Sequence, residues 1–194
     1  YTIDVSVAHK EILRGHLDLG GESVTGESIE VNSYYIERNG KPFFPVMGEF
    51  HYSRYPNQYW DEEIKKMKAG GINVIASYVF WILHERQEGV FNWEGDLNLR
   101  KFVELCGKND VEVIVRIGPF AHGEMRNGGL PDWLYGRPFE IRSNDPGYLF
   151  YASRLYTQVA QQLKGLYFKD GGPIIGIQLE NEYQHSAAPW SLHY

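Results

Sequence analysis

The chain has 194 residues, 19 Lys and Arg against 25 Asp and Glu, a net charge of −6 and 15% aromatic residues. That length suits one well-packed domain, and so many aromatic side chains exclude an intrinsically disordered chain. The acidic balance, without any basic run, argues against a nucleic-acid partner. No apolar stretch is long enough for a transmembrane helix. We therefore expect a globular domain with no nucleic-acid partner and no membrane span.

Two further features bear on the cellular compartment. Cys106 is the single cysteine and lies among apolar residues of an expected helix, which indicates a core position rather than a disulfide or a nucleophile. The chain begins at Tyr1 and not at a methionine, which is a weak sign of processing. The compartment therefore stays open, with a secreted or periplasmic protein weakly favoured.

The first 33 residues show little periodicity and predict an irregular or β-rich lead-in, so we place the main domain at residues 34–194. Within residues 34–44, Asn39-Gly40 separates two arms of aromatic and β-branched residues. This dipeptide favours the tight turn of a β-hairpin, because both residues tolerate a positive φ angle.

From residue 43 onward, apolar strands alternate with amphipathic helices. The expected strands are residues 44–48, 73–79, 111–117 and 173–179. The expected helices have a helical spacing of apolar residues at Trp60, Ile64 and Met67, at Leu99, Phe102, Val103 and Cys106, and at Leu155, Val159, Leu163 and Leu166. This alternation indicates an α/β fold with parallel strands. Four strands fit either an open sheet or the first four β/α units of a (β/α)8 TIM barrel.

Polar and aromatic residues follow each expected strand, at the carboxyl ends where α/β proteins bind ligands. Carboxylates beside aromatic rings are typical of sugar sites, because a pyranose offers an apolar face and a ring of hydroxyl groups. A metal site is the competing use of these side chains, with His51, His84, His122, Glu85 and Glu124 as the available ligands. Their spacing matches no metal-binding motif, so we expect neither a metal nor a cofactor.

Six segments resemble, in this order, the β-galactosidases of glycoside hydrolase family 35. They are GEFHYSR at 48–54, KMKAGGIN at 66–73, YVFW at 78–81 with HE at 84–85, RIGPF at 116–120, GGLPDWL at 128–134, and GPII at 172–175 running into ENEY at 180–183. The resemblance implies a (β/α)8 barrel that releases terminal β-linked galactose from oligo- or polysaccharides with retention of configuration.

The resemblance also implies roles for individual residues. Glu182 corresponds to the general acid/base of the family, and Asn181 to the amide that holds the sugar 2-hydroxyl. Tyr78 and Glu124 correspond to residues that contact galactose hydroxyls, and the backbone at Gly123 lines the pocket. These five residues are the predicted site.

Glu180 is a second carboxylate beside Glu182. Retaining hydrolysis uses two carboxylates about 5–5.5 Å apart across the sugar, which neighbours on one strand cannot provide. We therefore predict that Glu180 is a structural or supporting group, with Arg116 as its candidate partner. The resemblance places the nucleophilic glutamate at the end of a seventh strand, so the nucleophile and the remainder of the barrel are expected downstream of this chain.

Some positions depart from the commonest pattern of the family. His122 and Met125 stand where many members have cysteine and tryptophan, and Phe80 and Ile117 stand where proline is frequent. These differences bear on the preferred aglycone and linkage. Two alternatives remain open: a sister retaining glycosidase of the same clan that acts on another β-linked sugar, and a carbohydrate-binding barrel without catalysis.

Overall fold

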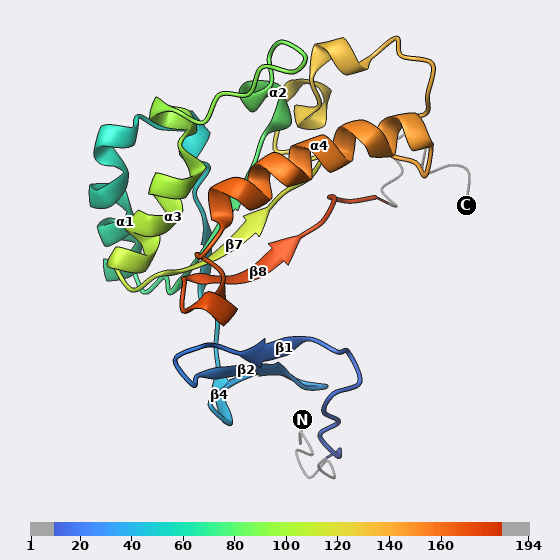
Figure 1. The fold of residues 1–194 in the computed structure, drawn as a ribbon. Coiled ribbons are helices and arrows are strands. Elements are labelled where there is room, and N and C mark those ends of the chain that lie inside the picture. Colours follow the sequence, from blue (N-terminus) through green and yellow to red (C-terminus); the bar gives the residue numbers. More distant parts are fainter. Residues whose placement is uncertain (1–9, 184–194) are drawn as a thin grey trace, which may run out of the picture. The chain divides into compact units, whose positions relative to one another are not determined.

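The computed structural model describes residues 10–183, in two compact units that divide between Phe44 and Pro45 (Figure 1). The first unit holds a four-stranded antiparallel sheet in the order β1-β2-β3-β4. Its strands are β1 (Gly20–Glu22), β2 (Ser28–Val31), β3 (Ile36–Arg38) and β4 (Lys41–Phe43).

The predicted hairpin at Asn39-Gly40 is confirmed. Asn39 and Gly40 have φ angles of 52° and 71° and join β3 to β4, as a tight turn with two left-handed residues requires. The same β3 also pairs with β2. Because this pairing ties the hairpin to the preceding strands, the first unit ends at Phe44 and not at residue 33, where the sequence placed the domain boundary.

The second unit has the predicted alternation of strands and helices. Its strands β5 (Met47–Glu49), β6 (Val74–Tyr78), β7 (Glu112–Arg116) and β8 (Ile174–Gln178) form a parallel sheet in chain order. The connections contain the helices α1 (Trp60–Ala69), α2 (Trp81–His84), α3 (Leu99–Lys108) and α4 (Pro146–Leu163). The helix α3 contacts both α1 and α4 (Figure 1). This arrangement confirms the α/β class.

The core of this unit lies between the sheet and the helices. Val113 and Val115, alternate residues of β7, are 0% exposed and belong to the same buried cluster as the helix residues. The apolar helix positions expected from their spacing are all buried except Met67, which packs against that cluster while partly exposed. Cys106 is 0% exposed, and burial raises the pKa of its thiol. Cys106 is therefore a core residue, as predicted.

The outer strands of the parallel sheet each have a free side among the strands of residues 10–183. Among the named strands, β5 pairs with β6 alone and β8 with β7 alone, and the other side of β8 carries one isolated bridge, between Ile174 and Tyr167. Apolar side chains are exposed beside both edges, with 47% exposure at Met47, 41% at Ile177 and 65% at Leu179. Parallel sheets are normally covered and closed. Both edges are therefore surfaces onto which further strands and helices fit.

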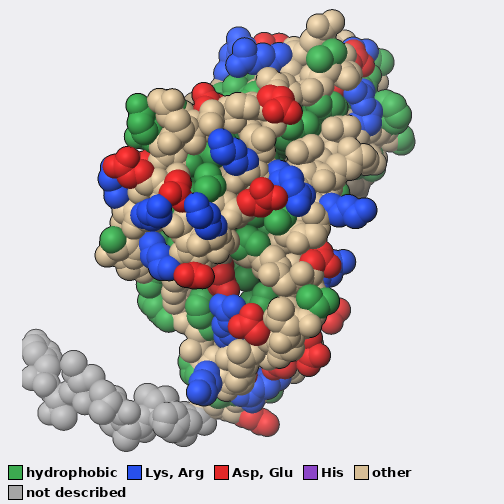
Figure 2. All heavy atoms as spheres, turned by 60° about the vertical axis from the view of Figure 1, so that its left-hand side comes forward, with side chains coloured by type: hydrophobic (Ala, Val, Ile, Leu, Met, Phe, Trp, Pro, Cys, Tyr) green, Lys and Arg blue, Asp and Glu red, His purple; other side chains and the backbone are tan. Residues whose placement is uncertain are grey.

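The solvent side of α1 and α3 carries charges of both signs close together (Figure 2). Ion pairs between residues one helical turn apart account for part of this pattern, at Asp61 with Lys65, Glu62 with Lys66, and Arg100 with Glu104. None of the helices within residues 10–183 combines the length and the apolar character that a membrane crossing requires.

Candidate active site

The carboxyl ends of the four parallel strands carry polar side chains at one edge of the sheet. Glu49, Tyr78 and Arg116 are the last residues of β5, β6 and β7, and Asn181 and Glu182 follow β8. Because all four strands run in the same direction, their ends share the edge where α/β proteins bind ligands. The residues that the sequence singled out after separate strands thus meet in space.

Three hydrogen bonds hold the side chain of Asn181. Its Oδ1 accepts from the Tyr78 hydroxyl at 2.9 Å, from an Arg116 Nη at 2.9 Å and from Gln178 Nε2 at 3.2 Å. Three donors at one end identify that end as the amide oxygen, so the Nδ2 group is the end with protons to donate to a ligand. Asn181 is 8% exposed. Its amide is therefore ordered before any ligand arrives.

Arg116 links the four strand ends. Its guanidinium carbon lies 3.7 Å from the centre of the Tyr78 ring, its Nε donates to Gln178 Oε1 at 3.0 Å, and one Nη pairs with Glu49. A planar cation with five N–H donors can bind several acceptors at once. Arg116 is absent from the site residues predicted from sequence, although its place at the end of an expected strand is a usable signal.

Glu182, the predicted acid/base, lies beside His122. Glu182 Oε2 is 3.2 Å from His122 Nδ1, and the two side chains are 48% and 51% exposed. The φ angle is 46° at Glu182 and 56° at Glu180. Both residues therefore have a left-handed backbone, and the alternation of side chains along a strand ends before Asn181.

Glu180 does not bind Arg116, so that prediction is wrong. Glu180 Oε2 lies 2.6 Å from an Nη of Arg142, and its Oε1 accepts a hydrogen bond from the Phe120 N–H at 3.2 Å. The prediction assumed an extended backbone, which the positive φ of Glu180 breaks. Burial raises the pKa of the Glu180 carboxyl, while the charge of Arg142 and the hydrogen bonds oppose that rise.

Arg142 connects this carboxylate to the backbone of the site. Its side chain is 0% exposed, and one Nη donates to the Asn181 carbonyl at 2.7 Å. The guanidinium carbon lies 3.9 Å from the centre of the Phe120 ring and 5.3 Å from that of Tyr183. A buried cation with this many contacts has little freedom to move. Arg142 thus fixes the backbone from which Asn181 and Glu182 project.

A loop with an unusual backbone brings His122, Gly123 and Glu124 to the same edge. Their φ angles are 60°, 50° and 50°. Non-glycine residues keep such angles only where the surroundings hold them. Here the carbonyl of Gly128 accepts hydrogen bonds from the N–H of Ala121 at 2.7 Å and from that of His122 at 3.1 Å. The loop is therefore a fixed part of the site.

Gly123 lies against two rings, which leave little room for a side chain. A Cβ atom at this position would be 3.1 Å from the Phe80 ring and 3.4 Å from the Tyr78 ring. The Gly123 carbonyl accepts a hydrogen bond from Arg54. Glu124, the next residue, is exposed to solvent. The structure thus places Gly123 beside Tyr78, and Glu124 on the open side of the loop.

Tyr78 is 4% exposed and uses its hydroxyl on Asn181. Burial raises the pKa of this hydroxyl, so Tyr78 is a neutral donor. The His51 ring lies beside it, with a centre-to-centre distance of 5.1 Å, and burial lowers the pKa of His51. In this structure, Tyr78 orders Asn181 rather than offering its hydroxyl to solvent.

His84 belongs to a buried cluster with Tyr52 and Trp93. Its Nε2 lies 2.6 Å from the Tyr52 hydroxyl and its Nδ1 lies 2.9 Å from the Asn92 carbonyl. Since a carbonyl only accepts, Nδ1 carries the proton and Nε2 accepts from Tyr52. Burial lowers the pKa of His84 to about 4. His84 is a neutral structural residue at physiological pH.

Glu85 is equally buried and fully occupied. Its carboxylate accepts from Trp81 Nε1 at 2.6 Å and from the Gly89 N–H at 2.7 Å, and it pairs with an Arg154 Nη at 2.9 Å. These contacts leave it no role as a metal ligand. Throughout residues 10–183, no group of three or more His, Cys, Asp or Glu residues is placed to hold a metal ion.

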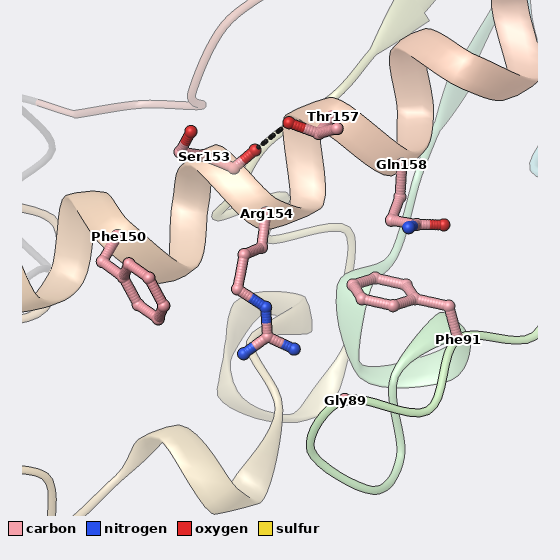
Figure 3. A pocket seen from close by; sticks show the side chains of 7 residues that line it. All are labelled: Gly89, Phe91, Phe150, Ser153, Arg154, Thr157 and Gln158. Carbon is pink, nitrogen blue, oxygen red and sulfur yellow. Dashed lines mark hydrogen bonds between the residues drawn. The ribbon is translucent and has the colours of Figure 1, made fainter.

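A pocket of about 490 Å³ lies at the surface of α4, away from the strand ends (Figure 3). Its lining consists of Gly89, Phe91, Phe150, Ser153, Arg154, Thr157 and Gln158. In Figure 3 the Arg154 guanidinium points between the rings of Phe91 and Phe150, but the same guanidinium is paired with Glu85. None of the predicted site residues lines this pocket, so we place the candidate active site at the strand ends instead.

The chain is similar to proteins of known family. It matches the model described as glycosyl hydrolases family 35 over residues 35–192. It is 44% identical over 156 residues to Beta-galactosidase 11 of Oryza sativa subsp. japonica, which covers 79% of this chain and 18% of that protein. It is 39% identical over 147 residues to a Beta-galactosidase of Xanthomonas manihotis. This match covers 75% of this chain and 25% of that protein. The chain thus spans between 18% and 25% of the length of these relatives.

A solved structure with a similar fold is the exo-β-1,4-mannosidase Op5Man5 from Opitutaceae bacterium strain TAV5. The TM-score is 0.60 at 17% identity, covering 90% of this chain and 30% of that one. At this identity the likeness shows the fold alone, and with the four parallel strands it confirms a partial (β/α)8 barrel. The fourth predicted β/α unit needs a helix after β8, and that part of the prediction lies outside the described residues. With a family match over residues 35–192, the chain belongs to family 35 of the glycosyl hydrolases.

Proposed function

We propose that this chain forms the first half of the catalytic barrel of a β-galactosidase. The enzyme removes terminal β-linked galactose from oligo- or polysaccharides and retains the configuration at the sugar. Membership of family 35 supports this proposal, as do the relatives from rice and Xanthomonas, which are named β-galactosidases.

The single observation that carries the proposal is the pair Asn181-Glu182 after β8. Asn181 has its oxygen end bound by Tyr78 and Arg116, which leaves Nδ2 to donate to a sugar hydroxyl. Glu182 is 48% exposed beside this amide. One amide that binds the sugar and one accessible carboxyl next to it are the parts that acid/base catalysis at a glycosidic bond requires.

Glu182 acts twice in the proposed reaction. In the first step its carboxyl proton passes to the glycosidic oxygen while the bond between that oxygen and the anomeric carbon breaks. In the second step the Glu182 carboxylate accepts a proton from the water that attacks the glycosyl-enzyme. The Nδ2 group of Asn181 donates to the 2-hydroxyl of the sugar, where such hydrogen bonds strengthen in the transition state.

The nucleophile belongs to a part of the barrel outside this chain. Two observations within residues 45–183 support the proposal that this unit is part of a barrel: β5 and β8 have free edges among the described strands, and apolar residues are exposed beside both. Glu180 is an unsuitable nucleophile because Arg142 and the Phe120 N–H bind its carboxylate. The second catalytic carboxylate therefore comes from the remainder of the barrel.

Gly123 and Glu124 form the proposed floor and rim of the galactose pocket. The Gly123 backbone lies against the Tyr78 ring, and the exposed Glu124 carboxylate can accept hydrogen bonds from sugar hydroxyls. Tyr78 contributes through Asn181, to which its hydroxyl is bound.

The test is the substitution Glu182→Gln in the complete enzyme that contains this chain, assayed on β-galactosides with poor and with good leaving groups. A poor leaving group needs a proton, so kcat/KM should fall about 10²- to 10⁴-fold for such substrates and much less for activated ones. Added azide, which needs no general base, should restore turnover of an activated substrate. Equal losses for all leaving groups would refute the acid/base role.

Glu180→Gln is the matched control, since it changes a carboxyl two residues away. This variant should lose stability through Arg142 and show no dependence on the leaving group. Aryl β-glucosides and β-mannosides, tested beside the β-galactoside, separate the proposal from a sister glycosidase. Sugar binding without turnover of any substrate would identify the barrel as a binding module.

A further inference from the structure

We propose that His122 is a positioning residue for the acid/base Glu182, which it holds by a hydrogen bond from Nδ1 and whose ionised form it stabilises. This inference rests on the proposed function, because it assigns a partner to the proposed acid/base. Its basis is the distance of 3.2 Å between His122 Nδ1 and Glu182 Oε2. The two residues come from different segments, the loop after β7 and the loop after β8.

Backbone and ring contacts hold His122 in the orientation that this hydrogen bond needs. Its N–H is bound to the Gly128 carbonyl at 3.1 Å, and its own carbonyl accepts from the Met125 N–H at 2.9 Å. The imidazole stacks on the Phe120 ring, with the ring centres 5.8 Å apart and the planes inclined by 22°. The Arg142 guanidinium packs on that same ring. The imidazole thus has a fixed support and one nitrogen directed at Glu182.

The proposed reaction gives this contact a chemical purpose. When the Glu182 proton passes to the glycosidic oxygen, a carboxylate remains, and the Nδ1–H of His122 donates to it. A donor or a positive charge at this distance favours the ionised carboxyl over the protonated one. His122 therefore lowers the energy of the state that follows the first step and keeps the carboxylate directed at the glycosidic oxygen until water arrives.

The other charged groups around this pair compensate one another. Arg116 is paired with Glu49, and Arg142 is paired with Glu180. Arg54, from the turn after β5, donates to the Gly123 carbonyl, and the exposed Glu124 follows Gly123 in the loop after β7. Burial lowers the pKa of His51 and raises the pKa of Tyr78, so both are neutral near pH 7. His122 is therefore the residue whose side-chain nitrogen lies within hydrogen-bond distance of the Glu182 carboxyl.

Two substitutions separate the hydrogen-bond donor from the imidazole ring that carries it. His122 has a φ of 60°, which asparagine and glycine tolerate better than other residues do. His122→Asn keeps a neutral N–H donor near the position of Nδ1. His122→Gly removes the donor and the stacked ring. Neither variant adds backbone strain, so both should fold.

The measurement is the pH dependence of kcat/KM in the complete enzyme, with a β-galactoside of poor leaving ability. Its alkaline limb reports the acid/base carboxyl of the free enzyme. Loss of the Nδ1–H donor in His122→Gly should move this limb upward, and His122→Asn, which keeps a neutral donor, should move it less. At the plateau, we expect kcat/KM to fall about threefold for His122→Asn and about tenfold for His122→Gly, and a tenfold loss corresponds to about 1.4 kcal/mol.

The same substitutions in the Glu182→Gln background complete a double-mutant cycle. If His122 acts through Glu182, its removal should change little once the carboxyl is gone. An unmoved alkaline limb, or equal losses in both backgrounds, would overturn the role of His122. If instead Glu182→Gln alone shows no dependence on the leaving group, the proposed function fails and the assignment of His122 fails with it.

Discussion

His84 with Glu85, and His122 with Glu182, are two groups of ionisable residues in the same unit of the molecule. His84 and Glu85 are 0% exposed and their polar atoms bind protein groups on every side. His122 and Glu182 are about half exposed and contact each other. Each group consists of one histidine and one glutamate. Solvent accessibility and unused hydrogen-bonding capacity therefore distinguish the structural group, His84 with Glu85, from the proposed catalytic group, His122 with Glu182. Substitutions should therefore affect stability in the first group and catalysis in the second.

The largest effect on stability is expected from Glu85→Ala. The substitution leaves Trp81 Nε1, the Gly89 N–H and Arg154 without their shared acceptor. Each buried donor left unsatisfied costs about 1–3 kcal/mol, so we expect a loss of about 2–6 kcal/mol for the two N–H groups. Urea or thermal unfolding of the complete enzyme should show this loss, while kcat/KM of the folded fraction stays close to that of the parent.

Glu88→Ala is its control, because Glu88 pairs with Arg137 at the surface, where both side chains are 36% exposed. Surface ion pairs contribute about 0–1 kcal/mol. Similar losses for Glu85→Ala and Glu88→Ala would contradict the distinction between the buried group and the exposed one.

His84 should make stability fall in acid. Its pKa is about 4 in the folded protein and about 6.5 in an unfolded chain. Between these values the unfolded state binds more protons, so stability is full above about pH 6.5 and falls by about 3 kcal/mol as the pH drops to 4. Urea denaturation at a series of pH values measures the slope. His84→Gln, which cannot titrate, should flatten it, and an unchanged slope would exclude His84 as the cause.

Gly128→Ala tests the support of the exposed group. A Cβ at Gly128 would lie 1.9 Å from the Phe120 ring, and its φ is 60°. The loss of stability should be about 2 kcal/mol, and kcat/KM should fall as well, because the Phe120 ring carries the imidazole of His122. Gly136→Ala is matched for backbone, with a φ of 78° and no atom within 4 Å of the new Cβ. It should lose about half as much stability and no activity.

Tyr78→Phe should have the smallest effect. It removes one of three hydrogen bonds to Asn181 Oδ1, while Arg116 and Gln178 remain. The expected loss of stability is about 1 kcal/mol, with kcat/KM about fivefold lower. Tyr156→Phe removes a comparable bond, from its hydroxyl to the Gly118 carbonyl at 2.8 Å, and should cost similar stability without the kinetic defect. Equal kinetics for the two variants would argue against a role of Tyr78 through Asn181.

The fold was largely readable from the sequence, because periodic apolar residues determine which faces of helices and strands are buried. The start of α4 was missed, although Asp145 caps the helix by accepting from the Gly147 N–H and Pro146 occupies its first turn. Those two residues are a recognisable signal for a helix start. The prediction used only the apolar spacing, which begins at Leu155 and does not mark the start of the helix.

The site was readable only in part. Asn181 and Glu182 could be found because they follow a predicted strand. The contacts of Arg142 and His122 could not be predicted. Both residues lie on loops and have positive φ angles, 59° and 60°, which the residue types arginine and histidine do not indicate. The same reason explains the wrong partner of Glu180. Tertiary contacts impose these backbone angles, and no local propensity predicts them.

The run of left-handed residues at His122, Gly123 and Glu124 also limits how this protein can be engineered. Side chains that branch at Cβ are poorly tolerated at such angles. Most variants in a library randomised over these three positions would therefore misfold. Met125, the next residue, has φ −91° and ψ 139°, which any side chain accepts. We expect a library that keeps Gly123, restricts positions 122 and 124 to Gly, Asn and Asp beside the parent residues, and varies Met125 fully to yield far more folded variants with altered sugar or aglycone preference.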